Sequence, residues 1–405
     1  MTTQSAPHGV AGRIPELDGL RGVAILMVLT YHYFENTMVT RPGTLLAHLQ
    51  SAMGLSWSGV DLFFVLSGFL IGGILLDARA STNYFRVFYT RRFFRIIPIY
   101  VVVLLVFPAL LSVTRWTGHS NDFAWLAMGR NSLPWWSYWT FTQNFWMAHT
   151  ERFGAMTLAI TWSLAIEEQF YLTLPFLVRL LTGPQLRKCV RLGIYAAPII
   201  RIGIGLHFHH NWMALFALMP CRADSLLLGV LAAMLMRDAQ WRERIQRSNR
   251  FAILIPVLLL GMVALTVWAH SVDNPIMQSL GYTWLALFYV SVLLCALTQT
   301  GSVLSRVLRT KWLGWLGGLA YGVYLFHQTI QGVLFGLIWH CEPVITGGYT
   351  LLTTLSALIL TLVIAQRSWK HFELPLVAGH RAVYQFAPRE EQVIPSEPWV
   401  FFKRV

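Results

Sequence analysis

Long apolar runs recur along nearly the whole chain and set the expected architecture. An α-helix needs about 20 predominantly apolar residues to cross a bilayer. Runs near that length predict ten membrane-spanning helices, at 18–34, 57–77, 94–113, 158–182, 190–207, 212–236, 251–268, 280–299, 313–339 and 349–366. The fifth run is the weakest, because Arg201 and Gly203-Ile204-Gly205 interrupt it. The pattern predicts an all-α, multi-pass membrane helical bundle.

The ends of the chain are polar. Residues 1–12 lack the apolar core of a signal peptide, so we expect the first span to act as its own uncleaved insertion signal. One membrane domain is expected over residues 13–375, followed by a polar cytoplasmic tail over 376–405.

Composition agrees with a membrane protein. The chain is 56% apolar and 12% charged, whereas soluble domains are about 25% charged. Only Cys341 of the four cysteines falls in a predicted outer loop, so no disulfide framework is expected. His207, His209 and His210 share a short outer loop without carboxylate or thiolate neighbours, so no metal site is predicted.

The net charge of +13 comes from 31 basic and 18 acidic residues. Basic residues concentrate in every second loop. Such an excess of Lys and Arg is typical of cytoplasmic loops. These loops contain Arg79, Arg86, Arg91, Arg92 and Arg95; Arg179, Arg187, Lys188 and Arg191; Arg237, Arg242, Arg244, Arg247 and Arg250; and Arg306, Arg309 and Lys311. Ten spans with both termini in the cytoplasm satisfy this rule. The charge therefore indicates orientation in a lipid bilayer, and no nucleic-acid partner is expected.

A cation and a histidine share one stripe of the first predicted span. Arg21 and His32 are eleven residues apart, which on a helix is about three turns, within roughly 20° of one face and about 16 Å along the axis. Intramembrane ionisable groups are costly and usually functional. An interfacial arginine with an incidental histidine is the alternative.

Further ionisable residues fall inside the other predicted spans: Asp61, Glu167, Glu168, Arg222, Asp224 and His327. Glu167 and Glu168 point about 100° apart on a helix, so one of them must find a partner or a water-filled space. Arg222 and Asp224 lie on opposite sides of a helix, and Arg222 is expected to neutralise Glu167 or Glu168 instead. Structural salt bridges and a satisfied buried histidine are the alternatives.

Two other segments have two interpretations each. Arg91, Arg92 and Arg95 at the inner boundary of the third span either anchor the topology or bind an anionic ligand such as a nucleotide phosphate. The outer segment 114–157 is rich in tryptophan, which either marks the membrane interface or stacks on sugar rings. Together with the intramembrane groups, the arginines describe a polar chamber with a cationic cytoplasmic mouth, which enzymes and ion-coupled transporters both possess.

Seven motifs, in order along the chain, resemble the acyltransferase 3 family of integral-membrane O-acyltransferases. They are Leu17-Asp18-Gly19-Leu20-Arg21-Gly22 with His32; Gly59-Val60-Asp61-Leu62-Phe63-Phe64 with Leu66-Ser67-Gly68-Phe69; Arg92-x-x-Arg95 before Ile96-x-Pro98-x-Tyr100; Trp162-Ser163; Glu167-Glu168-Gln169-Phe170-Tyr171; Arg222-x-Asp224; and Tyr321-Gly322-x-Tyr324-Leu325-x-His327. The resemblance covers residues 13 to 375.

The resemblance implies an enzyme that moves an acyl group, most commonly acetyl from acetyl-CoA, to a hydroxyl group. Acyl-CoA is a co-substrate on the cytoplasmic side, and no bound cofactor is implied. The acceptor is a polysaccharide, a lipid-linked sugar or a glycosylated small molecule, and in a bacterium the location is the inner membrane. Some relatives carry a hydrolase-like domain after the last span, where this sequence has residues 376–405.

The residue types fit this chemistry. Acyl transfer from a thioester to an alcohol needs a base for the hydroxyl and stabilisation of an oxyanion. We expect His32 to be the base, oriented by Asp61, Glu167 or Glu168, or else to carry the acyl group covalently. Arg21 is expected to hold the pantetheine or thioester end, and Arg91, Arg92 and Arg95 the CoA phosphates. The remaining residues expected to line the chamber are Tyr171, Arg222, Asp224 and His327. A transporter or flippase for an acidic solute is the alternative function, although the second half shows no repeat of the Arg21/His32 pattern.

Overall fold

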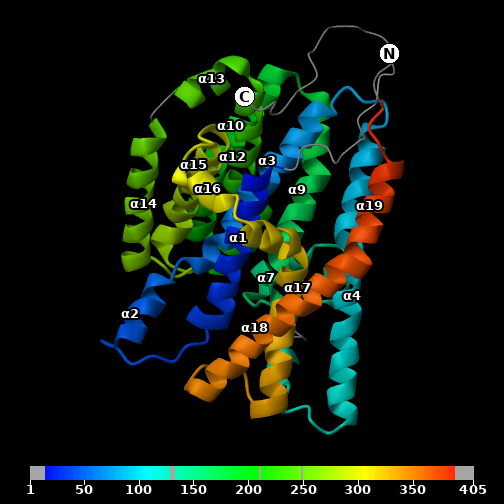
Figure 1. Cartoon of the computed structure of the whole chain (residues 1–405), viewed down its shortest axis with the longest axis vertical. Helices are drawn as coiled ribbons and strands as arrows, with labels where there is room; N and C mark the ends of the chain where they lie inside the picture. The colour runs from blue at the N-terminus through cyan, green and yellow to red at the C-terminus, as the bar shows by residue number, and fades with distance from the viewer. Residues whose placement is uncertain (1–13, 128–132, 209–210, 248–249, 388–405) are drawn as a thin grey trace, which may run out of the picture.

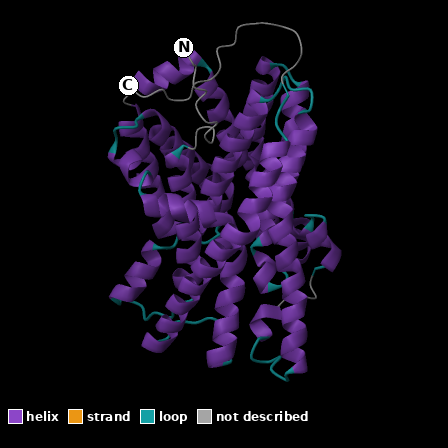
Figure 2. Cartoon of the chain, turned by 45° about the vertical axis from the view of Figure 1, so that its right-hand side comes forward, coloured by secondary structure: helices purple, strands orange, loops and turns teal. Residues whose placement is uncertain are grey.

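The protein is a bundle of helices. The computed structural model describes residues 14–127, 133–208, 211–247 and 250–387. It is 82% helical, and within these residues no strand forms (Figure 2). The bounds of the helices before the middle of the chain are α1 Pro15–Thr30, α2 Leu45–Ala52, α3 Gly59–Asp77, α4 Tyr84–Trp116, α5 Ala124–Ala127, α6 Trp135–Trp139, α7 Gln143–Thr150, α8 Met156–Ala159 and α9 Thr161–Leu180. Those that follow are α10 Gly183–His207, α11 Trp212–Ala217, α12 Met219–Arg237, α13 Ala239–Arg247, α14 Arg250–Trp268, α15 Tyr282–Thr298, α16 Val303–Leu308, α17 Lys311–Trp339, α18 Gly348–Ser368 and α19 Leu374–Val383.

Six helical stretches of the described chain are long and apolar enough to cross a membrane. They are Leu45–Asp77, Tyr84–Trp116, Gly183–His207, Trp212–Arg237, Met277–Thr298 and Gly348–Val383, and each contains one of the predicted runs. The other four runs also form helices, in α1, α9, α14 and α17, but these are shorter or less apolar. The chain is therefore an integral multi-pass membrane protein, and the number of ten spans stays a prediction.

The fifth apolar run, the weakest of the ten, forms one uninterrupted helix. α10 is continuous from Gly183 to His207, and a capping box of Thr182 and Gln185 starts it. Arg201 is buried, with 1% of its surface exposed, and its guanidinium lies 3.0 Å from the carboxylate of Asp224 on α12. Because a partner on a neighbouring helix neutralises the charge, the arginine does not break the span.

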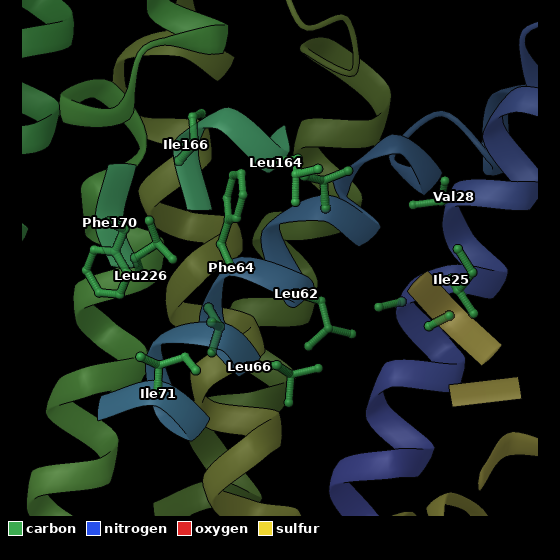
Figure 3. Packing of buried hydrophobic residues seen from close by; sticks show 14 of the residues in the cluster. Ile25, Val28, Leu62, Phe64, Leu66, Ile71, Leu164, Ile166, Phe170 and Leu226 are labelled. Atoms are coloured by element: carbon green, nitrogen blue, oxygen red, sulfur yellow. The ribbon is translucent and has the colours of Figure 1, made fainter. Parts of the chain in front are cut away.

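The core of the bundle is formed where α1, α3, α9 and α12 meet. Figure 3 shows buried side chains from all four helices, among them Ile25, Leu62, Phe64, Phe170 and Leu226. Each is at most 3% exposed. Such packing fixes the helices relative to one another, so polar side chains on their other faces are held in place.

Glycines allow two helix pairs to approach closely. On α3 and α12, an added Cβ atom at Gly68 would lie 1.9 Å from the backbone oxygen of Leu226, and one at Gly229 would lie 2.1 Å from that of Val65. On α1 and α17, a Cβ atom at Gly22 would lie 2.3 Å from the oxygen of Leu313, and one at Gly317 would lie 2.0 Å from that of Asp18. Small residues at such contacts are typical of packed membrane helices.

We expect Gly317→Ala to destabilise the protein by about 1–3 kcal/mol, because the methyl group would push α17 away from α1. The measurement is the thermal unfolding midpoint of the protein in detergent. Gly314→Ala, one turn away on the same helix, is the matched control, since an added Cβ atom at Gly314 meets nothing within 4 Å. Equal midpoints for both variants would contradict the close packing.

The outer segment between α4 and α9 packs on the far half of α17. Phe123 lies against Gly336, and Trp125 lies against Gly332. Asp122 anchors this contact, with hydrogen bonds to the rings of His119 (2.8 Å) and His340 (3.2 Å). These hydrogen bonds, that of His119 first, hold the pKa of the Asp122 carboxyl below its usual value.

The last helices cross the bundle and return along its edge. Figure 1 shows α18 in orange rising across the face of the molecule and α19 in red beside α4, with which it packs. The predicted boundary at residue 375 falls inside α19, so the first part of the predicted tail is helical. The beginning of α1 and the end of α19 lie toward the same end of the molecule (Figure 1).

Candidate active site

Two histidines meet because α1 and α17 run side by side in register. Gly22 contacts Gly317 at one end of the pair. His32 and His327 each follow ten residues later, and their ring centroids are 4.8 Å apart. Equal spacing on both helices means that the helices are parallel and keep their register over about 15 Å. We name His32 and His327 the histidine pair.

His32 lies in a π-helical turn, Tyr31–Glu35, directly after α1. Such turns often occur at functional sites. The Nδ1 atom of His32 is 3.0 Å from the carbonyl oxygen of Val28. A carbonyl only accepts hydrogen bonds, so in the neutral ring Nδ1 carries the proton and Nε2 keeps its lone pair. His32 is therefore arranged as a proton acceptor at Nε2.

His327 has the same arrangement and is fully buried. Its Nδ1 lies 2.7 Å from the carbonyl oxygen of Tyr324, which assigns the proton to Nδ1 in the same way. Its Nε2 is buried and has no hydrogen-bond partner among the described residues. The hydroxyl of Tyr33 donates to the backbone oxygen of His327 at 2.9 Å and holds this turn. Two imidazole lone pairs are thus available at one place.

A second polar group surrounds Arg21 at the other end of α1. Arg21 is close enough to Arg92, Tyr171 and Glu167 to interact with them electrostatically. The guanidinium of Arg92 lies 5.5 Å from the ring centroid of Tyr171. Together with Arg95, which interacts with both other arginines, these residues form what we name the arginine cluster: Arg21, Arg92 and Arg95.

The two adjacent glutamates face different surroundings. Glu167 accepts a hydrogen bond of 3.0 Å from the hydroxyl of Tyr171, which is also 2.5 Å from the hydroxyl of Ser67. Glu168 interacts electrostatically with Arg92, Tyr171, Tyr321 and Tyr100, whereas Arg21 interacts with Glu167. Its Oε1 is buried and unpartnered within the described chain. Glu167 is therefore the glutamate that adjoins Arg21, as the 100° between successive residues requires.

Arg95 and Arg91 have different neighbours in the structure. Arg95 lies against aromatic rings, 5.0 Å from that of Trp369 and 5.9 Å from that of Tyr321. Trp369 belongs to a second π-helical turn, Trp369–Glu373. Arg91 instead donates a hydrogen bond of 2.8 Å to the carbonyl of Tyr384 and lies 5.2 Å from the ring of Phe386. Arg91 and Arg95 lie one turn apart on the same side of α4, and each contacts a residue that follows α18. The binding of CoA phosphates by Arg91 stays a prediction.

Arg222 pairs with a carboxylate on a neighbouring helix, but Glu167 and Glu168 are not its partners. Arg222 forms a buried ion pair with Asp61 at 2.5 Å, and not with Glu167 or Glu168. Ser225 donates a further hydrogen bond to Asp61 at 3.3 Å. Asp224 pairs with Arg201 instead of Arg222, and it also accepts from the hydroxyl of Thr283 at 2.6 Å. The expectation that Arg222 and Asp224 do not pair with each other is confirmed.

The two ion pairs, Arg222 with Asp61 and Arg201 with Asp224, form what we name the double ion pair. It changes the interpretation of Asp61. Asp61 does not contact His32 by a hydrogen bond or ion pair in the described part of the chain, and the same holds for Glu167 and Glu168. Asp61, Arg222 and Asp224 are each fully buried, and they connect α3, α12, α10 and α15. Asp61 is thus part of a brace between helices, because its Oδ1 atom accepts hydrogen bonds from Arg222 and Ser225.

Sequence reasoning gave no role to several residues that the structure places here. Ser67, Ser163, Tyr321 and Tyr324 hydrogen-bond inside the polar chamber. One signal in the sequence identifies the second histidine as a partner of the first: glycine followed ten residues later by histidine occurs as Gly22 and His32 and again as Gly317 and His327.

The histidines considered for a metal fall mostly outside the described residues. His209 and His210 lie outside the described residues, and His207 ends α10. In the part of the chain that the structure describes, no group of three histidine, cysteine, aspartate or glutamate side chains is arranged to hold a metal ion. The histidine pair and the arginine cluster are therefore the candidate groups for chemistry.

Comparison with known proteins identifies related sequences. The chain is 26% identical over 398 residues to the peptidoglycan O-acetyltransferase OatA of Listeria monocytogenes, covering 90% of this chain and 56% of that protein. It is 25% identical over 393 residues to the putative peptidoglycan O-acetyltransferase YrhL of Bacillus subtilis, covering 90% and 55%. With the O-acetyltransferase OatA of Staphylococcus aureus, identity is 24% over 392 residues, covering 93% and 59%.

The chain thus spans a little more than half the length of these curated relatives. No solved structure matches it. The family model described as "Acyltransferase domain" matches residues 14–365, which include the histidine pair, the arginine cluster and the double ion pair. Because the match extends over most of the sequence, the chain belongs to this family of membrane acyltransferases, the acyltransferase 3 family.

Proposed function

We propose that this protein transfers an acyl group, in the first place acetyl, from cytoplasmic acyl-CoA to a hydroxyl of a polysaccharide. The relatives' names support acetyl as the group and a peptidoglycan-like glycan as the acceptor. The observation that carries the proposal is the geometry of His32. Its Nδ1 is fixed by the carbonyl of Val28, its Nε2 is left as an acceptor, and it shares a helix with Arg21.

The chemistry at the histidine pair follows from this arrangement. His32 Nε2 takes the proton of the acceptor hydroxyl while the hydroxyl oxygen attacks the carbonyl carbon of the thioester. A C–O bond forms, the C–S bond breaks, and the CoA thiolate leaves with the proton from the imidazolium of His32. Covalent transfer through an acylated His32 remains the alternative sequence of steps.

The arginine cluster is the proposed seat of the donor. Phosphates and thioester carbonyls carry negative or partly negative oxygens, which guanidinium groups bind by charge-assisted hydrogen bonds. Arg92 and Arg95 would hold the CoA phosphates and Arg21 the near end of the pantetheine arm, since Arg21 is on the helix that leads to His32. The pantetheine arm would bridge the roughly 16 Å along that helix.

The proposal is tested with the purified protein in liposomes. Acetyl-CoA and an oligomer of N-acetylglucosamine are supplied, and the oligomer is analysed by mass spectrometry. We expect a mass increment of one acetyl group that depends on both protein and acetyl-CoA. A protein that binds acetyl-CoA but modifies no sugar of this kind would contradict the proposed acceptor class.

Arg92→Gln and Arg95→Gln are expected to weaken acetyl-CoA binding by about 10- to 100-fold each, because each removes a charged hydrogen-bond donor from the phosphates. The measurement is the dissociation constant for acetyl-CoA by calorimetry. Arg91→Gln is the matched control on the same helix, since Arg91 contacts Tyr384 instead of the cluster, and it should bind like the wild type. Equal losses in all three variants would show that the arginines only anchor the helix.

A transporter or flippase for an acidic solute is the competing function for a chamber of this kind. Neither the family nor the named relatives favour it. Thermal stabilisation by CoA or acetyl-CoA separates the two functions, because a ligand that binds the folded state raises its unfolding midpoint. The transporter alternative predicts no such shift.

A further inference from the structure

Two glutamines extend the polar stripe of α17 beyond the histidine pair. Gln328 and Gln331 are 6% and 2% exposed. The Oε1 atom of Gln328 and the Nε2 atom of Gln331 are buried and have no hydrogen-bond partner in the described chain. A buried polar atom without a partner costs free energy. These atoms therefore indicate a ligand that supplies the missing hydrogen-bond partners.

The position of the glutamines relates them to His327. At 100° per residue, His327, Gln328 and Gln331 fall within about 100° of one face of α17. Gln331 is one turn beyond His327, in the direction away from Tyr321 and Arg95. The Nε2 atom of His327 is the third buried and unpartnered polar atom on this face. Three such atoms on one turn and a half of helix form a single candidate subsite.

The other buried amides of the described chain each make at least one hydrogen bond to the protein, although the Oε1 atom of Gln143 is also unpartnered. Asn144 and Gln169 exchange hydrogen bonds of 2.8 and 3.3 Å. The amide of Gln278 donates to the carbonyl of Val272 at 3.1 Å. By comparison, no side-chain hydrogen bond of Gln328 or Gln331 forms with a described residue.

The chemistry of the subsite selects its ligand. An amide carbonyl accepts and an amide NH₂ donates, and neither is charged, so the match is a ligand with neutral hydroxyl and amide groups. The indole of Trp125 lies against Gly332, next to Gln331, and supplies a flat apolar surface. A sugar ring presents polar groups at its edge and an apolar face. Its width is comparable to the distance of about 5.4 Å between side chains one helical turn apart.

We propose that Gln328 and Gln331 bind the acceptor sugar, with the reacting hydroxyl at the histidine pair and the neighbouring hydroxyl or N-acetyl group at Gln331. The inference rests on the proposed function and deepens it: the acceptor is a neutral, N-acetylated sugar and not an anionic one. The donor would approach from the arginine cluster and the acceptor from the opposite end of α17.

Gln331→Met and Gln328→Met test the subsite, because methionine keeps the approximate volume and removes the amide. Transfer from acetyl-CoA to an N-acetylglucosamine oligomer is measured in liposomes, with KM determined separately for each substrate. Each variant should raise the KM for the oligomer about tenfold and leave the KM for acetyl-CoA unchanged. Thermal unfolding should stay at the wild-type midpoint or above it, since no protein hydrogen bond is lost.

Gln278→Met is the matched control, because its amide is bonded to Val272. It should lower the unfolding midpoint and leave the KM for the oligomer unchanged. An unchanged KM for the oligomer in Gln331→Met and Gln328→Met would overturn the subsite, and so would a parallel rise in both KM values with a lowered midpoint. If the wild-type protein transfers no acetyl group to the oligomer, the proposed function itself fails, and this inference fails with it.

Discussion

Replacing His32 by alanine is expected to lower the rate of acyl transfer by about 10²–10⁴-fold while the protein stays folded. A positioned general base contributes a factor of this size. The hydrogen bond from Nδ1 to the carbonyl of Val28 orients the ring and leaves Nε2 as the acceptor. The measurement is the initial rate of acetyl transfer in liposomes, together with the thermal unfolding midpoint.

Three comparisons make the His32 prediction specific. His48→Ala, at an exposed position on α2, should keep the wild-type rate. The double variant with His327→Ala should lose little more than His32→Ala alone, because groups that act as a unit are not additive. Wild-type transfer in a folded His32→Ala protein would remove His32 from the reaction. An acyl group found on His32 after quenching without acceptor would replace direct transfer by the covalent route.

Replacing Arg222 by methionine is expected to destabilise the protein by about 3–5 kcal/mol. The change leaves the carboxylate of Asp61 buried without its counter-ion, and breaking one partner of a buried pair has this cost. Asp61→Asn should also destabilise, since Arg222 then loses its partner. The double variant Asp61→Asn/Arg222→Met should lie closer to the wild type than either single variant. The thermal unfolding midpoint in detergent is measured for the wild type, the two single variants and the double variant.

The same variants separate a brace from a catalytic group. If Asp61 acts only between helices, the stable double variant should keep most of the transfer rate per folded molecule. A stable but inactive double variant would instead restore the catalytic role that the sequence alone assigned to Asp61. Arg247→Met is the control, because its ion pair with Glu243 is largely exposed, and exposed pairs contribute about 0–1 kcal/mol.

The two ion pairs also explain how charged residues can occupy the middle of this bundle. Arg201 and Arg222 both lie near the ring of Tyr282, at 5.6 and 3.8 Å from its centroid. Each arginine therefore has a carboxylate and an aromatic face as neighbours, which lowers the cost of burial. Polar side chains of four helices meet here, and none of them is required to contact the histidine pair.

The sequence by itself determined the class of the protein and the identity of its chemical groups. Apolar runs and loop charges depend on residues close in sequence, so helix positions can be predicted from local pattern. The stripe that joins Arg21 to His32 follows from helical periodicity within one segment. The ordered motifs identified the family, to which the chain belongs.

Only the tertiary structure decided which of these groups meet. Asp61 and Arg222 are 161 residues apart, and periodicity within one helix does not specify the face that its neighbour presents. The same reason brings His327 to His32 and leaves the Nε2 atom of Gln331 without a hydrogen-bond partner among the described residues. The π-helical turns at Tyr31–Glu35 and Trp369–Glu373 shift the side chains that follow by a fraction of a turn. These turns form because of packing between helices, and local propensity does not predict them.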